Sequence, residues 1–389
     1  LANPLHPDVF PSMGKFEKEV VRMTKVMLGA KADDEVCGAV TSGGTESILM
    51  AMKTYRDQAK AEKGITNPEL IIPNTAHAAF DKAGSYFGIK VIKIKVDEKT
   101  GTLTAKQYEK HITKNTIVLV GSAPSYPWGI IDPIEDIAEL AKKHNIGMHV
   151  DACLGGFLLP WLVKNGVDLK QKFDFSVDGV TSMSADTHKY GYTSKGTSVV
   201  LYNSKQLRHH MYFVVTDWPG GVYASPSMSG SRPGALIAAA WASMVSLGES
   251  GYRKLAKEIQ DTADSIRTAV KEGKCGDIQL CGDPLAMVLA FDSKTYDIQR
   301  WATGMGKRGW NLNRLHQPNA VHICFTAATA GSQDKFISDS KAVNDDVVAD
   351  DTLYADGAAA VYGMAGQLPG ALQNVLITDL VKDYLDVIV

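Results

Sequence analysis

Short runs of β-branched and aliphatic residues alternate with longer amphipathic stretches through the first two thirds of this 389-residue chain. Six of the short runs are predicted strands: ELIIP (69–73), KVIKIKV (90–96), TIVLVGS (116–122), IGMHVDA (146–152), DGVTSMS (178–184) and TSVVLY (197–202). Helices are expected between several of them, over residues 14–29, 46–63, 76–86 and 133–144. Mostly apolar strands separated by helices predict an α/β fold with a largely parallel sheet.

The last third of the chain predicts a second, smaller domain. A helical stretch over 233–271, with a break near Gly248–Gly251, leads into this domain. Its own predicted elements are strands MVLAFDS (287–293) and AVHICFTA (320–327) and helical segments near 355–387. The acid-rich piece SDSKAVNDDVVADD (338–351) is expected to be an exposed connection. We therefore predict a large domain over residues 1–245 and a C-terminal α+β domain over residues 246–389.

The composition is that of an ordinary globular protein, with 45% hydrophobic and 22% charged residues and a net charge of −2. This balance argues against a nucleic-acid partner and against a polybasic membrane patch. Five scattered cysteines form no CxxC pair or His/Cys cluster, so we expect no metal site and a cytoplasmic or cytosol-facing location. The start, LANPLHPDVF, has no methionine or leader, so we expect upstream residues, which could carry a membrane anchor.

The stretch TSGGTESILMA (41–51) places two glycines before Thr45 and Glu46, at the start of an amphipathic helix. Free N–H groups at a helix N-terminus, with glycines that permit close approach, suit a phosphate. A plain helix cap would explain the same residues. The stretch lacks both the GKS or GKT of a Walker A loop and the GxGxxG spacing of a dinucleotide fold.

Two further residues follow predicted strands. His77, in IIPNTAHAAFDKA, could stack its imidazole on a planar ligand, or it could cap a helix or lie in the core. Asp151, in MHVDACLGG, ends an apolar strand, where a carboxylate is costly to bury without a cation or donor. It suits the protonated ring nitrogen of a pyridine-type cofactor, although it could also cap the next turn.

Lys189 lies in SADTHKYGYTSKG (184–196), among small residues typical of a loop. A lysine becomes nucleophilic when its pKa is lowered by desolvation or by nearby positive charge, which His188 and Lys195 could supply. Alone, it would be interpreted as a surface lysine. Taken in order, the glycine turn, the histidine, the strand-end aspartate and this lysine satisfy the phosphate, ring face, ring nitrogen and aldehyde carbon of pyridoxal 5′-phosphate (PLP). The residues therefore predict a PLP enzyme.

Eight stretches carry a resemblance to a known family: NPLHPDVFPS (3–12), TSGGTESI (41–48), TAHAAFDKA (75–83), GSAPSYPWG (121–129), HVDACLGGF (149–157), DTHKYGYTSKG (186–196), GGVYASPSMSGSRPG (220–234) and VYGMAG (361–366). In these stretches, which extend over nearly the whole chain, the sequence resembles the PLP-dependent group II decarboxylase family of fold type I. It is most similar to the sphingosine-1-phosphate lyases of that family. TSGGTES and DTHKYG would fit several PLP decarboxylases, whereas NPLHPDVFP and GSRPG single out the lyases.

The resemblance implies a role for each matching residue. Implied cofactor contacts are Lys189 at the aldehyde carbon, Asp151 at the pyridinium nitrogen, His77 on the ring face, and Gly44, Thr45 and His188 at the phosphate. Ser231 would reach the phosphate of a neighbouring subunit, because the active sites of the family lie at the interface of a homodimer. His6, Tyr126 and Lys195 would line the substrate end, although the family motif varies around Tyr126.

The implied reaction is a retro-aldol cleavage of the C2–C3 bond of sphingosine 1-phosphate and similar phosphorylated sphingoid bases. Its products would be a long-chain aldehyde and phosphoethanolamine. Lys195 and Tyr126 are candidate proton carriers, and Lys189 is a third once it is freed. A protein of this fold that has lost catalysis is the non-enzymatic alternative, and the presence of both Lys189 and Asp151 argues against it.

Two other activities fit the same scaffold. An amino-acid decarboxylase would need a cation for the substrate carboxylate, commonly an arginine of the small domain. The strand VHICFTAATAG has no arginine, but Arg308 and Arg314 are close to it in sequence. A cysteine desulfurase would need Cys324 or Cys153 as nucleophile, and Cys324 lies in an apolar strand typical of a buried thiol.

Overall fold

The computed structural model describes residues 2–6, 8–355, 378, 381–382 and 385–386. The chain divides into two compact units, unit 1 with Leu1–Gln260 and Gly282–Ala286, and unit 2 with Asp261–Cys281 and Met287–Val389. The division at Gln260 falls inside the long helix α8 (Gly234–Lys271), which is kinked at Gly248 as predicted, with a φ of 56°. VYGMAG (361–366) and most of the helical segment predicted near 355–387 lie outside the described residues.

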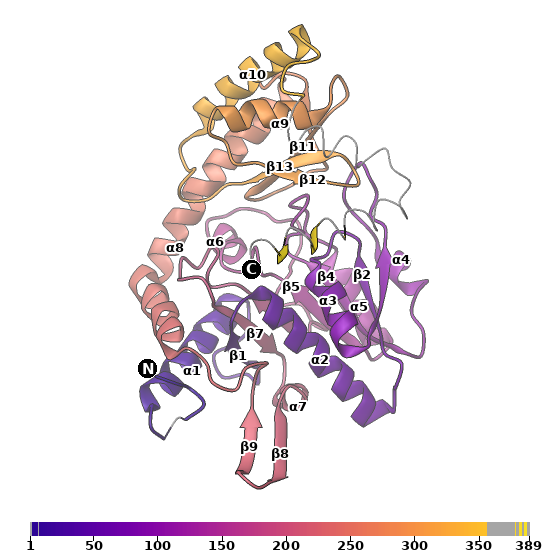
Figure 1. Ribbon diagram of the computed structural model, residues 1–389, viewed down its shortest axis with the longest axis vertical. Coiled ribbons are helices and arrows are strands. Elements are labelled where there is room, and N and C mark those ends of the chain that lie inside the picture. Colours follow the sequence, from indigo (N-terminus) through magenta and orange to yellow (C-terminus); the bar gives the residue numbers. More distant parts are fainter. Residues whose placement is uncertain (1, 7, 356–377, 379–380, 383–384, 387–389) are drawn as a thin grey trace. The chain divides into compact units, whose positions relative to one another are not determined.

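Unit 1 is built on a seven-stranded sheet in the order β1-β7-β6-β5-β4-β2-β3 (Figure 1). Its strands are β1 (Cys37–Thr41), β2 (Glu69–Pro73), β3 (Lys90–Ile94), β4 (Thr116–Ser122), β5 (Gly147–Asp151), β6 (Ser182–Ala185) and β7 (Ser198–Tyr202). Neighbouring strands are parallel except in the two pairs that include β7. The predicted α/β fold with a largely parallel sheet is confirmed, and β1 adds a strand to the six that were predicted.

Helices pack on both faces of this sheet. Those that precede α8 are α1 (Pro11–Met27), α2 (Gly44–Lys63), α3 (Ala79–Phe87), α4 (Ala105–Glu109), α5 (Ile134–Lys143), α6 (Leu159–Lys164) and α7 (Lys205–His209). Successive side chains of a strand point to opposite faces, and β4 shows the consequence. Val120 belongs to the buried cluster that includes residues of α2 and α3, whereas Gly121 faces Ile134 and Ile137 of α5.

A two-stranded hairpin of unit 1, β8 (Phe213–Trp218) and β9 (Gly221–Ser225), lies outside the large sheet (Figure 1). More than half of the surface of several apolar side chains on it is exposed: Phe213 56%, Val214 55%, Trp218 55% and Val222 74%. The sequence reasoning did not predict this hairpin. Clustered exposed apolar residues of this kind typically mark a surface that another molecule covers.

Unit 2 carries a four-stranded antiparallel sheet in the order β10-β11-β13-β12. Its elements are β10 (Ile278–Leu280), β11 (Val288–Ser293), α9 (Ile298–Lys307), β12 (Asn313–Leu315), β13 (Ala320–Cys324) and α10 (Gln333–Ala349). The predicted smaller α+β part is thus confirmed. The prediction of an exposed connection over 338–351 is wrong, because α10 continues to Ala349. Val343 and Val347, one helical turn apart, are buried and hold that acid-rich helix on the unit.

Candidate active site

A cavity of about 320 Å³ lies where β1, β2, β5 and β6 end. Five of the predicted site residues line it: Gly44, Thr45, His77, His188 and Lys189. They come together because these strands run in one direction, so their carboxyl ends meet at one edge of the sheet. A cavity of this size suits a cofactor of small-molecule dimensions.

The glycine turn forms one wall of the cavity. Gly43 is the N-cap of α2, and no side chain caps the helix there. A Cβ on Gly44 would lie 2.7 Å from Asp186 Oδ2 and 2.8 Å from Cys153 Sγ, so only glycine fits between them. The first backbone N–H groups of α2 thus begin at the cavity without a side-chain acceptor, an arrangement that suits a phosphate.

Glu46 in the first turn of α2 closes the glycine turn and ties it to a distant segment. Its Oε2 accepts a hydrogen bond from the Ser42 N–H at 2.6 Å, and its Oε1 accepts one from the Met228 N–H at 3.1 Å. Met228 lies three residues before Ser231, which is exposed and accepts a hydrogen bond from Asn3 Nδ2 at 3.0 Å. Ser231 does not line the cavity of its own chain.

Lys189 is held by a carboxylate that the sequence reasoning missed. Its Nζ lies 3.0 Å from Oδ2 of Asp186, which is 2% exposed and whose Oδ1 has no hydrogen-bond partner among the described residues. Burial alone would lower the pKa of Lys189, but Asp186, Cys153 and Asp151 outweigh it and raise that pKa. The expectation of a lowered pKa is wrong for this state, because the nearest charge is negative. Asp186 lies in the quoted motif, three residues before the lysine.

His188 lies beside the same carboxylate. Its Nδ1 accepts a hydrogen bond from the Thr197 N–H at 3.2 Å, and its Nε2 lies 3.7 Å from Asp186 Oδ2. Burial lowers the pKa of His188, the charges of Lys195 and Lys189 lower it further, and Asp186 opposes the shift. A neutral His188 whose Nδ1 is an acceptor carries its proton on Nε2 and can donate from there.

Asp151 ends β5, and His77 lies in the turn between β2 and α3. His77 lines the cavity, whereas Asp151 does not line it and adjoins it through Cys153. Asp151 Oδ1 accepts hydrogen bonds from the Cys153 N–H at 3.0 Å and from Ser184 Oγ at 3.3 Å. No described residue donates a hydrogen bond to its Oδ2, which leaves that oxygen for the N–H of a pyridinium ring. His77 is exposed in the turn before α3, and its Nδ1 accepts a hydrogen bond from the Ala79 N–H at 3.0 Å.

Three predicted substrate residues are not brought to this cavity. His6, Tyr126 and Lys195 are exposed, and none of them lines it. Lys195 is nevertheless close enough for its charge to affect the pKa of His188. The structure thus places five of the predicted cofactor residues in the cavity and Asp151 beside it, whereas the predicted substrate residues lie outside the cavity.

The residues considered for other activities have structural roles of their own. Arg308 pairs with a carboxylate of α10 at 3.0 Å, and Arg314 donates to a glutamine of α9 at 2.7 Å, both within unit 2. Burial raises the pKa of the Cys153 thiol well above its usual value, and nearby carboxylates add to the shift. A thiol in that environment is a poor nucleophile.

The residues that line the cavity, together with Asp151 beside it, fit PLP in several independent respects. An uncapped helix start suits its phosphate, Gly44 leaves no room for a side chain, and Asp151 has a free carboxylate oxygen. Lys189 supplies the amine that an aldehyde requires. These features lie at one edge of one sheet, as a single bound cofactor needs.

Comparison with known proteins gives the family. Residues 3–294 match the family model described as the pyridoxal-dependent decarboxylase conserved domain. The chain is 45% identical over 387 residues to a sphingosine-1-phosphate lyase of Arabidopsis thaliana, covering 98% of this chain and 70% of that protein. It is 47% identical over 369 residues to that of Drosophila melanogaster, covering 94% and 67%.

A solved structure agrees with these relatives. The sphingosine-1-phosphate lyase of Burkholderia pseudomallei is 41% identical and matches with a TM-score of 0.86, covering 90% of this chain and 80% of that one. The predicted type I fold is thereby confirmed. The chain belongs to the pyridoxal-dependent decarboxylase family and, within it, to the sphingosine-1-phosphate lyases.

Proposed function

We propose that this protein cleaves the C2–C3 bond of sphingosine 1-phosphate and related phosphorylated sphingoid bases. The products are a long-chain aldehyde and phosphoethanolamine. The observation that carries the proposal is 44–47% identity to sphingosine-1-phosphate lyases over nearly the whole chain. The cavity at the sheet edge supports it, because its residues fit the cofactor that such a cleavage needs.

PLP is the cofactor, and when bound it accepts the electron pair that is released as the carbon–carbon bond breaks. The residues that would hold it are Lys189 at the aldehyde carbon, Asp151 at the ring nitrogen, His77 on the ring face, and the N–H groups of Gly44 and Thr45 with His188 at the phosphate. By holding a negative charge at the ring nitrogen, Asp151 favours its protonated form.

The chain itself must also move a proton. The C3 hydroxyl of the substrate loses its proton as the bond breaks, and C2 takes up a proton before phosphoethanolamine is released. We assign the first of these transfers to Lys195 or Tyr126, with His6 at the same substrate end. Lys189 is a third candidate after the substrate amine has displaced it. Asp186, 3.0 Å from Lys189 Nζ, is placed to bind that ammonium whenever the lysine is free.

We infer that the working unit is a homodimer with its active sites at the interface. The exposed apolar side chains of the β8–β9 hairpin supply a surface for a second copy. Ser231, which follows this hairpin, lies outside the cavity of its own chain, as a residue serving the neighbouring subunit would. The Glu46 carboxylate hydrogen-bonds both the glycine turn and the loop after β9. The proposed cofactor site and the proposed dimer interface are therefore connected through this one side chain.

A reducing, cytosol-facing compartment is part of the proposal. All five cysteines lie in the described part of the chain and none forms a disulfide. Over the residues that the structure describes, no helix combines the length and the apolar character that crossing a membrane requires.

Product analysis tests the activity. Purified protein loaded with PLP is incubated with sphingosine 1-phosphate, and aldehyde and phosphoethanolamine are measured by mass spectrometry, with Lys189→Ala as the control. Both products from the wild type alone are expected. A PLP-loaded protein that leaves the lipid intact would refute the substrate and keep the cofactor site.

A further inference from the structure

A line of buried hydrogen bonds ends at Asp151. Ser184 Oγ donates to Asp151 Oδ1 at 3.3 Å, and His149 Nε2 lies 3.2 Å from Ser184 Oγ. On the other side of the imidazole, His149 Nδ1 lies 2.7 Å from Ser182 Oγ, which in turn lies 2.6 Å from the Tyr55 hydroxyl. Asp151 is 8% exposed, and the other four residues are at most 1% exposed.

The pairing of β5 with β6 produces this line. In their parallel register His149 is opposite Ser182, and Asp151 is opposite Ser184. Residues two apart in a strand point to the same face, so the histidine and the aspartate alternate with the two serines across one face of the sheet. Tyr55 reaches the same face from α2.

The proton positions along the line follow from valence. Burial lowers the pKa of His149 to about 4, although Asp151 opposes the shift, so the ring is neutral and has one N–H. Ser184 gives its only proton to Asp151 and must therefore accept from His149 Nε2–H. His149 Nδ1 then accepts from Ser182, which accepts from the Tyr55 hydroxyl. Every donor in the line points toward the carboxylate.

We propose that His149 is a positioning residue for Asp151, acting through Ser184. It fixes the direction of the Ser184 hydroxyl, so that Asp151 Oδ1 is occupied by two donors, this hydroxyl and the Cys153 N–H. The carboxylate is then held in one orientation, with Oδ2 turned to the remaining ligand. This inference rests on the proposed function, since it takes PLP as that ligand.

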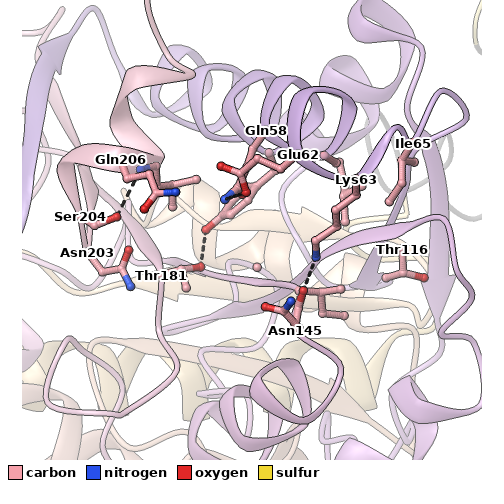
Figure 2. Close-up of a pocket in the computed structure, with 16 residues that line it drawn as sticks. Gln58, Glu62, Lys63, Ile65, Thr116, Asn145, Thr181, Asn203, Ser204 and Gln206 are labelled. Carbon is pink, nitrogen blue, oxygen red and sulfur yellow. Dashed lines mark hydrogen bonds between the residues drawn. The ribbon is translucent and has the colours of Figure 1, made fainter.

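The far end of the line meets a second cavity, of about 260 Å³, at the opposite edge of the sheet (Figure 2). Thr116, Gly147 and Thr181 at or just before the starts of β4, β5 and β6 line it, together with Tyr55. The Tyr55 hydroxyl lies 2.6 Å from Thr181 Oγ1. Figure 2 labels Thr181 and marks a hydrogen bond at its side chain. The line thus crosses the sheet from a polar cavity to the cofactor edge, and Tyr55 is its outermost member.

Binding of PLP to four variants tests the proposal. His149→Phe keeps a ring against Phe80, whose centroid lies 5.9 Å from that of His149, but removes both hydrogen bonds. We expect it to weaken PLP binding about 10-fold and to change the absorption spectrum of the bound cofactor. Ser184→Ala should do the same, and the double variant should be no worse than about 10-fold, because both changes cut one line. His149→Gln, which restores an N–H donor, should recover most of the affinity.

The outcomes separate this proposal from the proposed function. If the wild type does not bind PLP, the proposed function fails. If it binds PLP and the two single variants multiply their effects in the double variant, His149 does not act through Ser184. If PLP affinity and spectrum stay those of the wild type while only the melting temperature of the cofactor-free protein falls, His149 is a packing residue and the proposal is wrong.

Discussion

Among single residues, the state of Lys189 in the site depends on its pairing with the buried carboxylate of Asp186. Asp186 has one oxygen on Lys189 and one oxygen without a partner among the described residues, and it is almost fully buried. Such a carboxylate needs a cation beside it. In the absence of a cofactor, Lys189 is that cation, and its raised pKa keeps the amine protonated. Capture of an aldehyde requires the neutral amine, so we expect the pairing with Asp186 to slow the capture of PLP by Lys189.

The variant Asp186→Asn should therefore make Lys189 reactive at lower pH. With the negative charge gone, the pKa of Lys189 falls, and the midpoint of the pH profile for PLP capture should fall by about one unit. The measurement is the rate of capture by cofactor-free protein as pH is varied. Asp178→Asn, which removes an exposed carboxylate paired with Lys142, is the control and should leave the midpoint in place. An unchanged midpoint in Asp186→Asn would show that Asp186 does not control the protonation of Lys189.

Asp132 is a second buried carboxylate, next to the end of β4. Its Oδ2 accepts from the Ser122 N–H at 2.7 Å, and its Oδ1 is buried without a hydrogen-bond partner among the described residues. Burial, with a smaller contribution from Asp151, raises the pKa of Asp132 to about 7. The folded state thus binds this proton more tightly than the unfolded state, whose pKa is near 3.8. The free energy of unfolding therefore falls as pH rises from about 4 to about 7, and then levels off.

Asp132→Asn should remove this loss of unfolding free energy at neutral and higher pH. The amide is neutral at every pH and can still accept from Ser122, so the variant should gain about 2–4 kcal/mol over the wild type at about pH 8 and little at about pH 4. Urea unfolding of the cofactor-free protein at both pH values measures the difference. Equal changes at the two pH values would show that the charge of Asp132 is not the cause.

At the scale of elements, the site depends on the contact between α2 and the loops that follow β5 and β6. Gly44→Ala would push a methyl group against Asp186 and Cys153. We expect PLP binding to weaken about 10-fold, which is the size of a moderate overpacking cost. Titration of the cofactor-free protein with PLP measures this. Gly306→Ala in α9, where an added Cβ meets nothing within 4 Å, is the matched control and should bind PLP normally.

Much of this arrangement was predictable, because buried parallel strands are continuous apolar runs that are easily recognised. β1 was missed because CGAVT is short and rich in small residues. α10 was misread because acidic residues surround Val343 and Val347, the positions that hold it. The Met228 N–H donates a hydrogen bond to Glu46, 182 residues earlier in the chain, and no local sequence pattern predicts this bond.

Some residues of the candidate site could likewise be predicted from the sequence, and others could not. The proposed cofactor residues lie in local motifs at or soon after strand ends, so their clustering could be expected from the direction of the strands. The role of Asp186 could have been predicted from the sequence, since it lies in the same motif as Lys189. The line of hydrogen bonds from Tyr55 to Asp151 could not be predicted, because it depends on the register of β5 against β6 and on a residue of α2.

At the scale of the whole molecule, the proposed dimer makes a prediction about mixed subunits. If Ser231 serves the neighbouring chain, each active site takes Lys189 from one chain and Ser231 from the other. Lys189→Ala and Ser231→Ala then remove residues that different chains contribute to the same site. Unfolding and refolding the two variants together should form mixed dimers that have one intact site each. Random association would restore about a quarter of wild-type activity. A mixture no more active than its separate components would place Ser231 in its own chain's site, or nowhere near one.

We propose Lys189, at this edge of the sheet, as the residue that binds the cofactor. The most direct measurement is to load the protein with PLP, fix the link with borohydride, and locate the modified residue by peptide mass spectrometry. We expect Lys189 to be modified in the wild type and in Lys195→Ala, and the modification to be lost in Lys189→Ala. Modification of Lys195, or labelling spread over surface lysines, would contradict it.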